Sequence, residues 1–414
     1  MLSVIQQYIK NVKGFNRNVK LYILATVLIN IGFGVFYADF NLYILSMGMT
    51  PDFLGIILSL APFAEGLSSI PLGFLAEKIG FKRSLIMVYI VLGFAYFLQV
   101  ISPARWLIML GSLMVGLVIG GNFIIQLPYL SHYTREDRNS AFSMTTLVYY
   151  ITNATGSLIG SRLPALLNPL FMNETLTYRV LLSGASLLVL FGSVPMFFVE
   201  DDKPDPRRDI SFEPYLKGMD LNTRKFAITE FFIGLSFAFI ASFLNIIFVY
   251  YFHASLEFYG TTLAVLVIPT TLFLFFGPAI AGKLGNLRAV LIARAMVIFM
   301  AFGVVMTINP YIGAAAFILF RSFFGFSQSL WFSFATSVST RRSRMATSVW
   351  LEITFQIGMG IAALVGGQLI AAGAFRMLGV ISAISMAVCL TLTYKYFGRE
   401  YLTALKKPEL AVSE

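Results

Sequence analysis

The fold is decided by the stretch Pro71-Leu-Gly-Phe-Leu-Ala-Glu-Lys-Ile-Gly-Phe-Lys-Arg83, which separates two long apolar runs. Further apolar runs of about 20 residues recur throughout the chain, each long enough to cross a hydrocarbon layer of roughly 30 Å. Of the 414 residues, 58% are hydrophobic and only 12% are charged, whereas a soluble domain carries about 25% charged residues. The sequence therefore predicts a protein whose solvent is lipid.

The apolar runs predict an all-α polytopic membrane protein, because lipid offers no partners for the backbone groups of an open strand. We expect twelve transmembrane helices, six on each side of a polar, proline-containing segment. Their predicted ranges are 20–46, 53–77, 82–101, 105–130, 140–166, 176–199, 225–252, 258–282, 287–308, 311–336, 345–372 and 375–397.

Nearly all basic residues fall in segments predicted to lie on one side of the membrane. The exceptions are Arg105, Arg162, Arg179 and Arg376 on the opposite side, and Arg294 and Arg321 within helices. The positive-inside rule then places both termini in the cytoplasm and predicts an integral protein of the cell membrane, inner or plasma. The excess of basic residues on the cytoplasmic side accounts for the net charge of +10, so we expect no nucleic-acid partner. Residues 1–19 are basic and lack a cleavage site, which predicts a cytoplasmic leader.

The opening stretch resembles the signature loop of the major facilitator superfamily, which reads Gly-x-Leu-Ala-Asp-Arg-x-Gly-Arg-Lys between that family's second and third helices. Here Glu77 replaces the Asp, Lys78 replaces the Arg, and Phe81 departs from a basic residue. The resemblance implies alternating access around a substrate site between two six-helix bundles, close to the middle of the membrane. We predict these bundles at 20–199 and 225–397, with a cytoplasmic linker at 200–224 and a cytoplasmic tail at 398–414.

The resemblance also implies that the loop is a gating latch. Gly73 would let its helix approach the helix predicted over 345–372. Glu77 would lie near the positive start of that helix, around Ser343, and near Arg138. The alternative is a loop whose basic residues only set the topology. The gating residues that we expect are Gly73, Glu77, Lys78, Gly80, Lys82, Arg83 and Arg138.

An internal repeat supports the division into two halves. The segment 278–288 has the pattern of the opening stretch, although Gly282 stands at the position of Glu77. The residues that keep their types are Lys78, Gly80 and Arg83 in the first half and Lys283, Gly285 and Arg288 in the second.

Three acids within predicted helices are candidates for proton coupling, because an ionisable group inside the bilayer costs at least about 2.5 kcal/mol. Glu65 lies near the midpoint of its helix, between Pro62 and Pro71, and Asp39 lies in the outer part of the first helix. Glu352 is four residues from Gln356 and can pair with it. The alternative for Glu65 is a hydrogen bond to a neighbouring helix. A hydrated position at the outer end is the alternative for Asp39.

Polar residues on one face of several helices are candidates for a substrate cavity. In the first helix Asn30, Tyr37 and Asn41 share a face, and Asp39 points nearly the opposite way. The resemblance places the first, fourth, seventh and tenth helices around the cavity. The complete set that we expect is Asn30, Tyr37, Asn41, Asn122, Gln126, Asn245, Arg321 and Gln328.

Different roles are expected for three further charged residues in the predicted helices. Arg321 can bind a carboxylate or phosphate of the substrate with two hydrogen bonds. Alternatively, it can pair with an acid such as Glu65, Glu230 or Glu352 and stabilise the fold. Glu230 lies early in its helix, where an acid needs no transport role. We expect Arg294 to extend its side chain to the cytoplasmic surface.

These features predict a secondary active transporter. The favoured activity is proton-coupled export of small amphipathic compounds. The coupling partner is the proton or another ion. One alternative is uptake or exchange of an organic anion through Arg321, and another is a non-transporting receptor or lipid-handling protein. No phosphate-binding loop is present, and Cys389, His132 and His253 lie far apart. We therefore expect no enzyme activity, no cofactor and no metal site. The partners expected are a small-molecule substrate and the lipid bilayer, with the protein a monomer.

Overall fold

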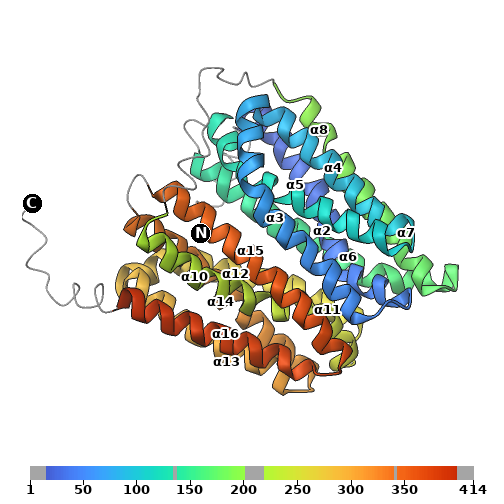
Figure 1. The fold of residues 1–414 in the computed structure, drawn as a ribbon. Helices are drawn as coiled ribbons and strands as arrows, with labels where there is room; N and C mark the ends of the chain where they lie inside the picture. The colour runs from blue at the N-terminus through green and yellow to red at the C-terminus, as the bar shows by residue number, and fades with distance from the viewer. Residues whose placement is uncertain (1–14, 134–137, 201–218, 340–342, 399–414) are drawn as a thin grey trace, which may run out of the picture. The chain divides into compact units, whose positions relative to one another are not determined.

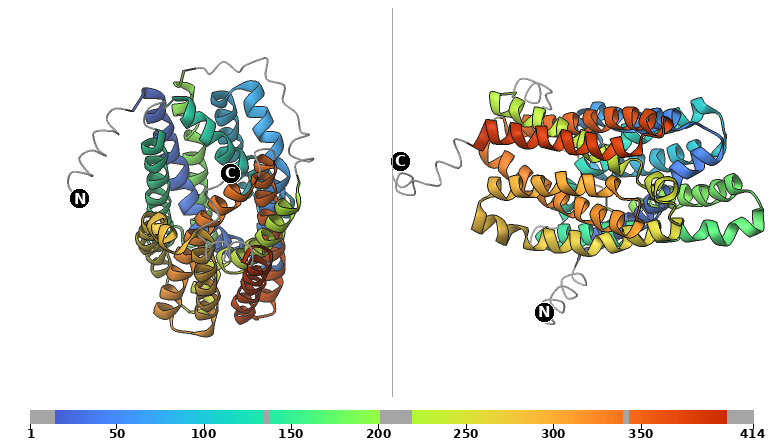
Figure 2. Two further views of the ribbon diagram at one scale, coloured as in Figure 1. Left: turned by 90° about the vertical axis from the view of Figure 1, so that its left-hand side faces the viewer. Right: turned by 90° about the horizontal axis from the view of Figure 1, so that it is seen from below.

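The computed structural model describes residues 15–133, 138–200, 219–339 and 343–398, and these form helices and short connections with no strand among them. Figure 1 shows the helices, and Figure 2 shows that those within each half of the chain run alongside one another. The first half contains α2 (Arg17–Ser46), α3 (Pro51–Ile79), α4 (Phe81–Ile101), α5 (Arg105–Tyr133), α6 (Arg138–Phe171), α7 (Glu174–Phe191) and the short α8 (Val194–Phe197).

The second half has the same order of long helices. It contains α10 (Leu221–Ala241), the short α11 (Leu244–Ile246) with the π-helical turn η1 (Ile247–Tyr251), α12 (Leu256–Leu284), α13 (Asn286–Met306), α14 (Pro310–Val338), α15 (Arg344–Ala371), and α16 (Phe375–Thr393) with the π-helical turn η2 (Tyr394–Gly398). Each of the twelve predicted helices is therefore present. The helices predicted over 176–199 and 225–252 are each interrupted once, before α8 and before α11.

Ten helical segments of the described chain are long and apolar enough to cross a membrane, and Arg105–Gly121 of α5 is a shorter apolar stretch. The long helix α6 is not among them. Its sequence contains Thr, Ser and Asn side chains at many positions, and several of these face polar surroundings described below. The fold is that of an all-α polytopic membrane protein.

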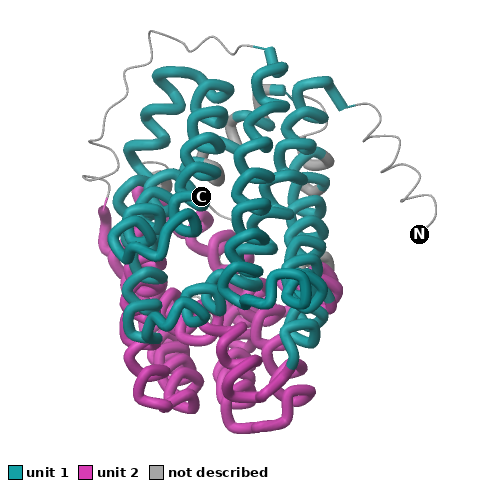
Figure 3. The backbone as a smooth tube through the Cα atoms, turned by 90° about the vertical axis from the view of Figure 1, so that its right-hand side faces the viewer, with its two compact units in different colours: residues 1–210, 255–264 teal, residues 211–254, 265–414 magenta. Residues whose placement is uncertain are grey.

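The chain forms two compact units, coloured separately in Figure 3. The first comprises residues 1–210 with 255–264, and the second comprises 211–254 with 265–414. The first turns of α12 are thus counted with the first unit and its remainder with the second. The domain limits predicted from the sequence stay a prediction.

Close helix packing recurs at corresponding places in the two units. In the first unit α2 packs on α6, and in the second α10 packs on α15. A Cβ on Gly34 would overlap the backbone carbonyl of Asn153, and a Cβ on Gly234 would overlap the carbonyl of Phe355. Both contacts require glycine, as small residues are required wherever membrane helices touch through their backbones.

The signature loop and its repeat have the same backbone conformation. Gly80 has φ of 93° and Gly285 has φ of 82°, and each ends one long helix and begins the next. Side chains with a Cβ rarely adopt this conformation. The two glycines therefore make the same sharp corner, α3 to α4 and α12 to α13, which confirms the pseudo-symmetry of the two six-helix halves.

Candidate substrate and coupling sites

A cavity of about 360 Å³ lies within the first unit, among α2, α4, α5 and α6. It has the size of a pocket for a small organic molecule. Its lining residues are Tyr22, Thr26, Ile29, Asn30, Tyr89, Gln126, Thr145, Thr146, Tyr149 and Tyr150. All are uncharged, so the cavity offers aromatic faces, hydroxyls and two amides and no charged group.

Asn30 has an unused hydrogen-bond acceptor at this cavity. Its Nδ2 donates to the carbonyl of Thr26 at 2.7 Å, whereas its buried Oδ1 has no partner. A buried acceptor without a partner costs free energy, so a hydroxyl or N–H group of a bound molecule would be favoured there. Tyr149 and Tyr150 lie edge to face nearby, with ring centroids 5.4 Å apart.

The structure brings together two of the predicted cavity residues of the first half. Asn30 and Gln126 line the cavity, but Tyr37 and Asn41 do not. Tyr37 is 42% exposed and Asn41 is buried. At 1.5 Å per residue they lie about 10 and 16 Å further along α2 than Asn30, so a shared helix face does not bring them to one pocket. The side chain of Asn122 is outside the described residues.

None of the other lining residues is among those predicted from the sequence. Thr145, Thr146, Tyr149 and Tyr150 are four residues of α6 one turn apart in pairs. Polar pairs at that spacing in a membrane helix are the sequence signal that could have indicated this face.

Asp39 is buried in the first unit, apart from the cavity. Its side chain is 0% exposed, and neither carboxyl oxygen has a hydrogen-bond partner. It faces α6, where a Cβ on Gly160 would lie 2.7 Å from its Oδ2. Among the described residues no cation forms an ion pair with it.

The other two candidate coupling acids lie in different surroundings. Glu65 is partly buried against α5, and a Cβ on Gly120 would lie 3.2 Å from its Cγ. It is also within electrostatic range of the hydroxyl of Tyr96. Glu352 is partly buried in the second unit and accepts a hydrogen bond from Nε2 of Gln356 at 2.8 Å, the pair expected from their spacing.

A cluster of buried polar side chains connects four helices of the second unit. The carboxylate of Glu230 on α10 accepts hydrogen bonds from Gln328 and from Nε1 of Trp331, the latter at 2.9 Å, both on α14. Arg294 on α13 lies with its guanidinium carbon 4.2 Å from the Trp331 ring centroid and donates to Thr393 on α16 at 2.6 Å.

The position of the Arg294 side chain differs from the one predicted from the sequence. The residue is 0% exposed, so its side chain does not extend to the surface. Stacking on a tryptophan face and the hydrogen bond to Thr393 provide an alternative to water. Gln328 donates a hydrogen bond to Glu230, an acid for which the sequence indicates no particular role. The cavity role predicted for Gln328 stays a prediction.

The remaining predicted residues of the second half lie apart from one another. The guanidinium of Arg321 lies 4.7 Å from the ring centroid of Phe237; in the described residues it forms no ion pair with Glu230 or Glu352. Asn245 is buried, and its Oδ1 accepts from the backbone N–H of Ile246 at 2.9 Å, next to the break between α10 and α11.

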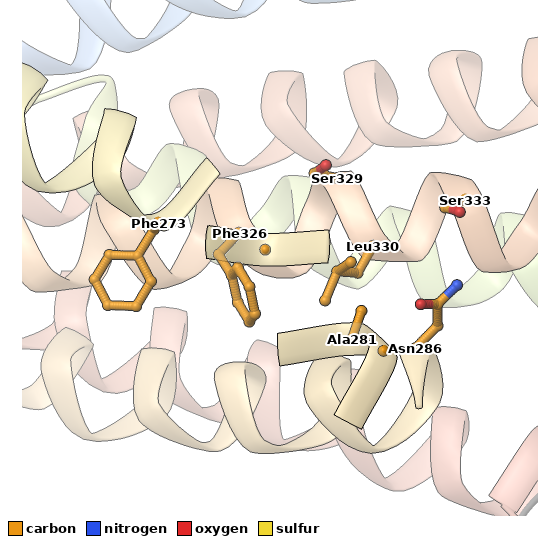
Figure 4. Close-up of a pocket in the computed structure, with 9 residues that line it drawn as sticks. Phe273, Ala281, Asn286, Phe326, Ser329, Leu330 and Ser333 are labelled. Carbon is orange, nitrogen blue, oxygen red and sulfur yellow. The ribbon is translucent and has the colours of Figure 1, made fainter. Parts of the chain in front are cut away.

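A second cavity, of about 420 Å³, lies between α12, α13 and α14 of the second unit and contains none of the predicted residues. Phe273 and Phe326 lie at one end of it, and Asn286 and Ser333 lie at the other (Figure 4). Ser329 and Ser333 repeat at helical spacing, which is the sequence signal that could have indicated this face.

The gating residues are only partly described. Gly80 forms the corner between α3 and α4 as described above, whereas the side chain of Arg138 is outside the described residues. The contact predicted between Glu77 and the helix start at Ser343 joins residues of the two units and stays a prediction.

Comparison with known proteins agrees with this architecture. The family model of the Major Facilitator Superfamily matches residues 22–349. The chain therefore belongs to this superfamily of membrane transporters. No match to the sequence was found among curated proteins.

Several solved structures have a similar fold. A variant of the nucleoside transporter NupG superposes with a TM-score of 0.76 at 14% identity, covering 92% of this chain and 100% of that one. A bacterial homolog of the human lysosomal transporter Spinster, inward-facing and unoccupied, gives a TM-score of 0.74 at 13% identity, covering 91% and 95%. Its occupied form gives 0.75 at 14% identity, covering 93% and 97%.

Proposed function

We propose that this protein is a secondary active transporter that moves a small, uncharged amphipathic compound by alternating access, coupled to protons. The uncharged cavity of the first unit carries the proposal. We further propose that it works as a monomer in the cell membrane with both termini in the cytoplasm, and that its direction is export. These finer points rest on the charge distribution and the family resemblance.

The chemistry of the cavity supports an uncharged substrate with a ring and hydroxyl groups. Tyrosine faces stack on a planar ring, and Asn30, Gln126 and the threonines can exchange hydrogen bonds with hydroxyls. A nucleoside has this combination, and one structural neighbour is named a nucleoside transporter. The lining of this cavity has no basic side chain that could bind an anionic substrate.

The first test is uptake and efflux of labelled nucleosides, a neutral amphipathic drug and an organic anion in proteoliposomes, comparing wild type, Asn30→Ala and Asn41→Ala. We expect transport of a neutral compound, with KM raised about tenfold or more in Asn30→Ala, because a lost hydrogen bond to a buried group costs about 1–3 kcal/mol. Asn41→Ala removes a buried amide of the same helix outside the cavity, and it should raise KM less than Asn30→Ala does.

Two results would contradict the proposal. One is equal loss of transport in both variants, which would favour the stripe Asn30–Tyr37–Asn41 over the cavity. The other is binding of amphiphiles without any flux in either direction, which would favour a receptor or a lipid-handling protein.

A second candidate function is transport of an organic anion through Arg321. The observation that favours it is the lack of an acidic partner for this guanidinium among the described residues, which leaves its charge for a ligand. The same transport assay distinguishes the two candidate functions. Anion flux abolished in Arg321→Gln but retained in Asn30→Ala would replace the first proposal.

A further inference from the structure

The carboxyl group of Asp39 lies beneath a contact between α6 and the first turns of α12. Gly160 of α6 leaves room for it: a Cβ there would lie 2.7 Å from Oδ2 and 3.1 Å from the Cα of Val35. Tyr259 of α12 is 1% exposed and lies within electrostatic range of both Asp39 and Tyr37.

Two successive residues of each helix form this contact. A Cβ on Gly260 would overlap the hydroxyl of Ser161, and Ser161 is itself buried. Next to it, Nη2 of Arg162 donates to Oγ1 of Thr261 at 3.2 Å. Ser161 and Arg162 of α6 thus meet Gly260 and Thr261 of α12, next to Tyr259, and all of these residues belong to the first unit. We call residues 259–261 the α12 lid.

The protonation state of Asp39 decides whether the lid can remain closed. An ionised carboxylate in an apolar interior needs a cation or several hydrogen-bond donors. In the described residues Asp39 has neither. The closed contact is therefore compatible with the neutral acid and opposed by the carboxylate, which would draw water toward itself.

We propose that the α12 lid is a proton-controlled closure: it packs on Ser161 and Arg162 while the Asp39 carboxyl is neutral, and it lifts when that carboxyl ionises. Release would detach segment 255–264 from the unit to which it now belongs. The inference rests on the proposed proton coupling, since it assigns a proton-binding step to Asp39, one of the candidate acids. Its test requires neither a substrate nor transport.

Titratable and charged groups other than Asp39 on the neighbouring segments need to be distinguished from it. They come from α2, α6, α7 and α12 and from the turn before α12, and they are Tyr37, Arg162, Arg179, Tyr259, Glu257 and His253. Arg179 is held by the hydroxyl of Tyr43 at 3.3 Å. Glu257 and His253 are exposed.

The lid can be followed by the reactivity of a cysteine beneath it. The single native cysteine, Cys389, is replaced by serine, and Ser161→Cys is introduced into the full chain in nanodiscs. Its rate of reaction with a water-soluble maleimide is divided by that of Met172→Cys, a 90% exposed position at the end of α6. This ratio removes the general rise of thiolate concentration with pH.

We expect the ratio to rise at least tenfold between pH 5.5 and pH 8.5 in wild type and to stay low and flat in Asp39→Asn, which keeps a neutral side chain. Glu257→Gln and His253→Asn should retain the rise. A ratio that does not change with pH in the wild-type background would overturn the proposal. So would a rise that persists in Asp39→Asn or disappears in either control.

If Asp39→Asn does not fold, the wild-type profile and the two controls still decide the question, because the rise must be present in all three. Failure of the nucleoside assay leaves this labelling result unaffected. Conversely, transport coupled to protons together with a flat labelling ratio would retain the proposed function and reject the lid.

Discussion

At the scale of single residues, the buried charges of the second unit depend on one another. Arg294 lies against Trp331 and Thr393, and Glu230 accepts hydrogen bonds from Gln328 and Trp331. Two of the Arg294 nitrogens, Nε and Nη2, are buried without a partner. The positive charge is therefore held by a ring face, one hydroxyl and the nearby carboxylate.

Replacing Arg294 by methionine should destabilise the protein by about 3–5 kcal/mol, because the buried Glu230 would keep its two hydrogen bonds but lose the nearby positive charge. The double variant Arg294→Met/Glu230→Gln should recover part of this loss. The measurement is thermal unfolding in detergent, followed by tryptophan fluorescence. Arg288→Met, an exposed arginine on the same helix, is the control and should be close to wild type. A double variant that is less stable than both single variants would show that the two charges do not compensate each other.

At the scale of helices, glycine sets how closely α2 and α6 approach, and the same holds for α10 and α15. At Gly34 the neighbour of an added Cβ is backbone, which cannot rotate away. The helices must then separate along their whole contact. Other helical glycines, such as Gly184 on α7, have nothing within 4 Å of an added Cβ.

The substitution Gly34→Ala should therefore lower stability and, because α2 contributes Asn30 to the cavity, weaken substrate binding. The matched substitution Gly184→Ala should be neutral or stabilising by up to about 1 kcal/mol, since alanine favours the helix. Melting temperatures of both variants in one detergent check this. Equal effects of the two substitutions would mean that the α2–α6 contact is not limited by backbone approach.

At the scale of the whole molecule, the chain is a member of the Major Facilitator Superfamily with twelve long helices in its described residues and a family match over residues 22–349. Alternating access belongs to this fold. A carboxyl group that binds a proton must then be reached from different sides at different times. Asp39 and Glu65 are the candidates in the first unit.

A pH gradient imposed on proteoliposomes should drive substrate flux, and substrate should drive proton flux in return. We expect Glu65→Gln to reduce this coupled flux at least tenfold if Glu65 carries the proton, whereas Asp52→Asn, an exposed acid on the same helix, should leave it unchanged. The sign of the flux decides between export and import. Transport that is indifferent to both pH and Glu65 would remove Glu65 from the coupling mechanism.

The sequence by itself determined the class of protein, the number of long helices and the equivalence of Gly80 and Gly285. Length and polarity of an apolar run decide that it spans a bilayer, and a glycine after a basic turn marks a corner. These properties are local, so they can be read from neighbouring residues. The starts predicted at 176, 225 and 311 lie one to four residues inside the observed helices, which are capped by Asn173, Asp220 and Asn309.

The tertiary structure alone decided which polar residues meet. The sequence places Asn30, Tyr37 and Asn41 on one face, yet only Asn30 lines the cavity. It also gave no sign that Gly160 and Tyr259 lie next to Asp39, or that Trp331 and Thr393 hold Arg294 away from the surface. The physical reason is that helical periodicity relates residues within one helix. Whether a side chain is buried, and which residue it pairs with, depends on which other helix covers that face. It also depends on the position along the two helices at which they touch.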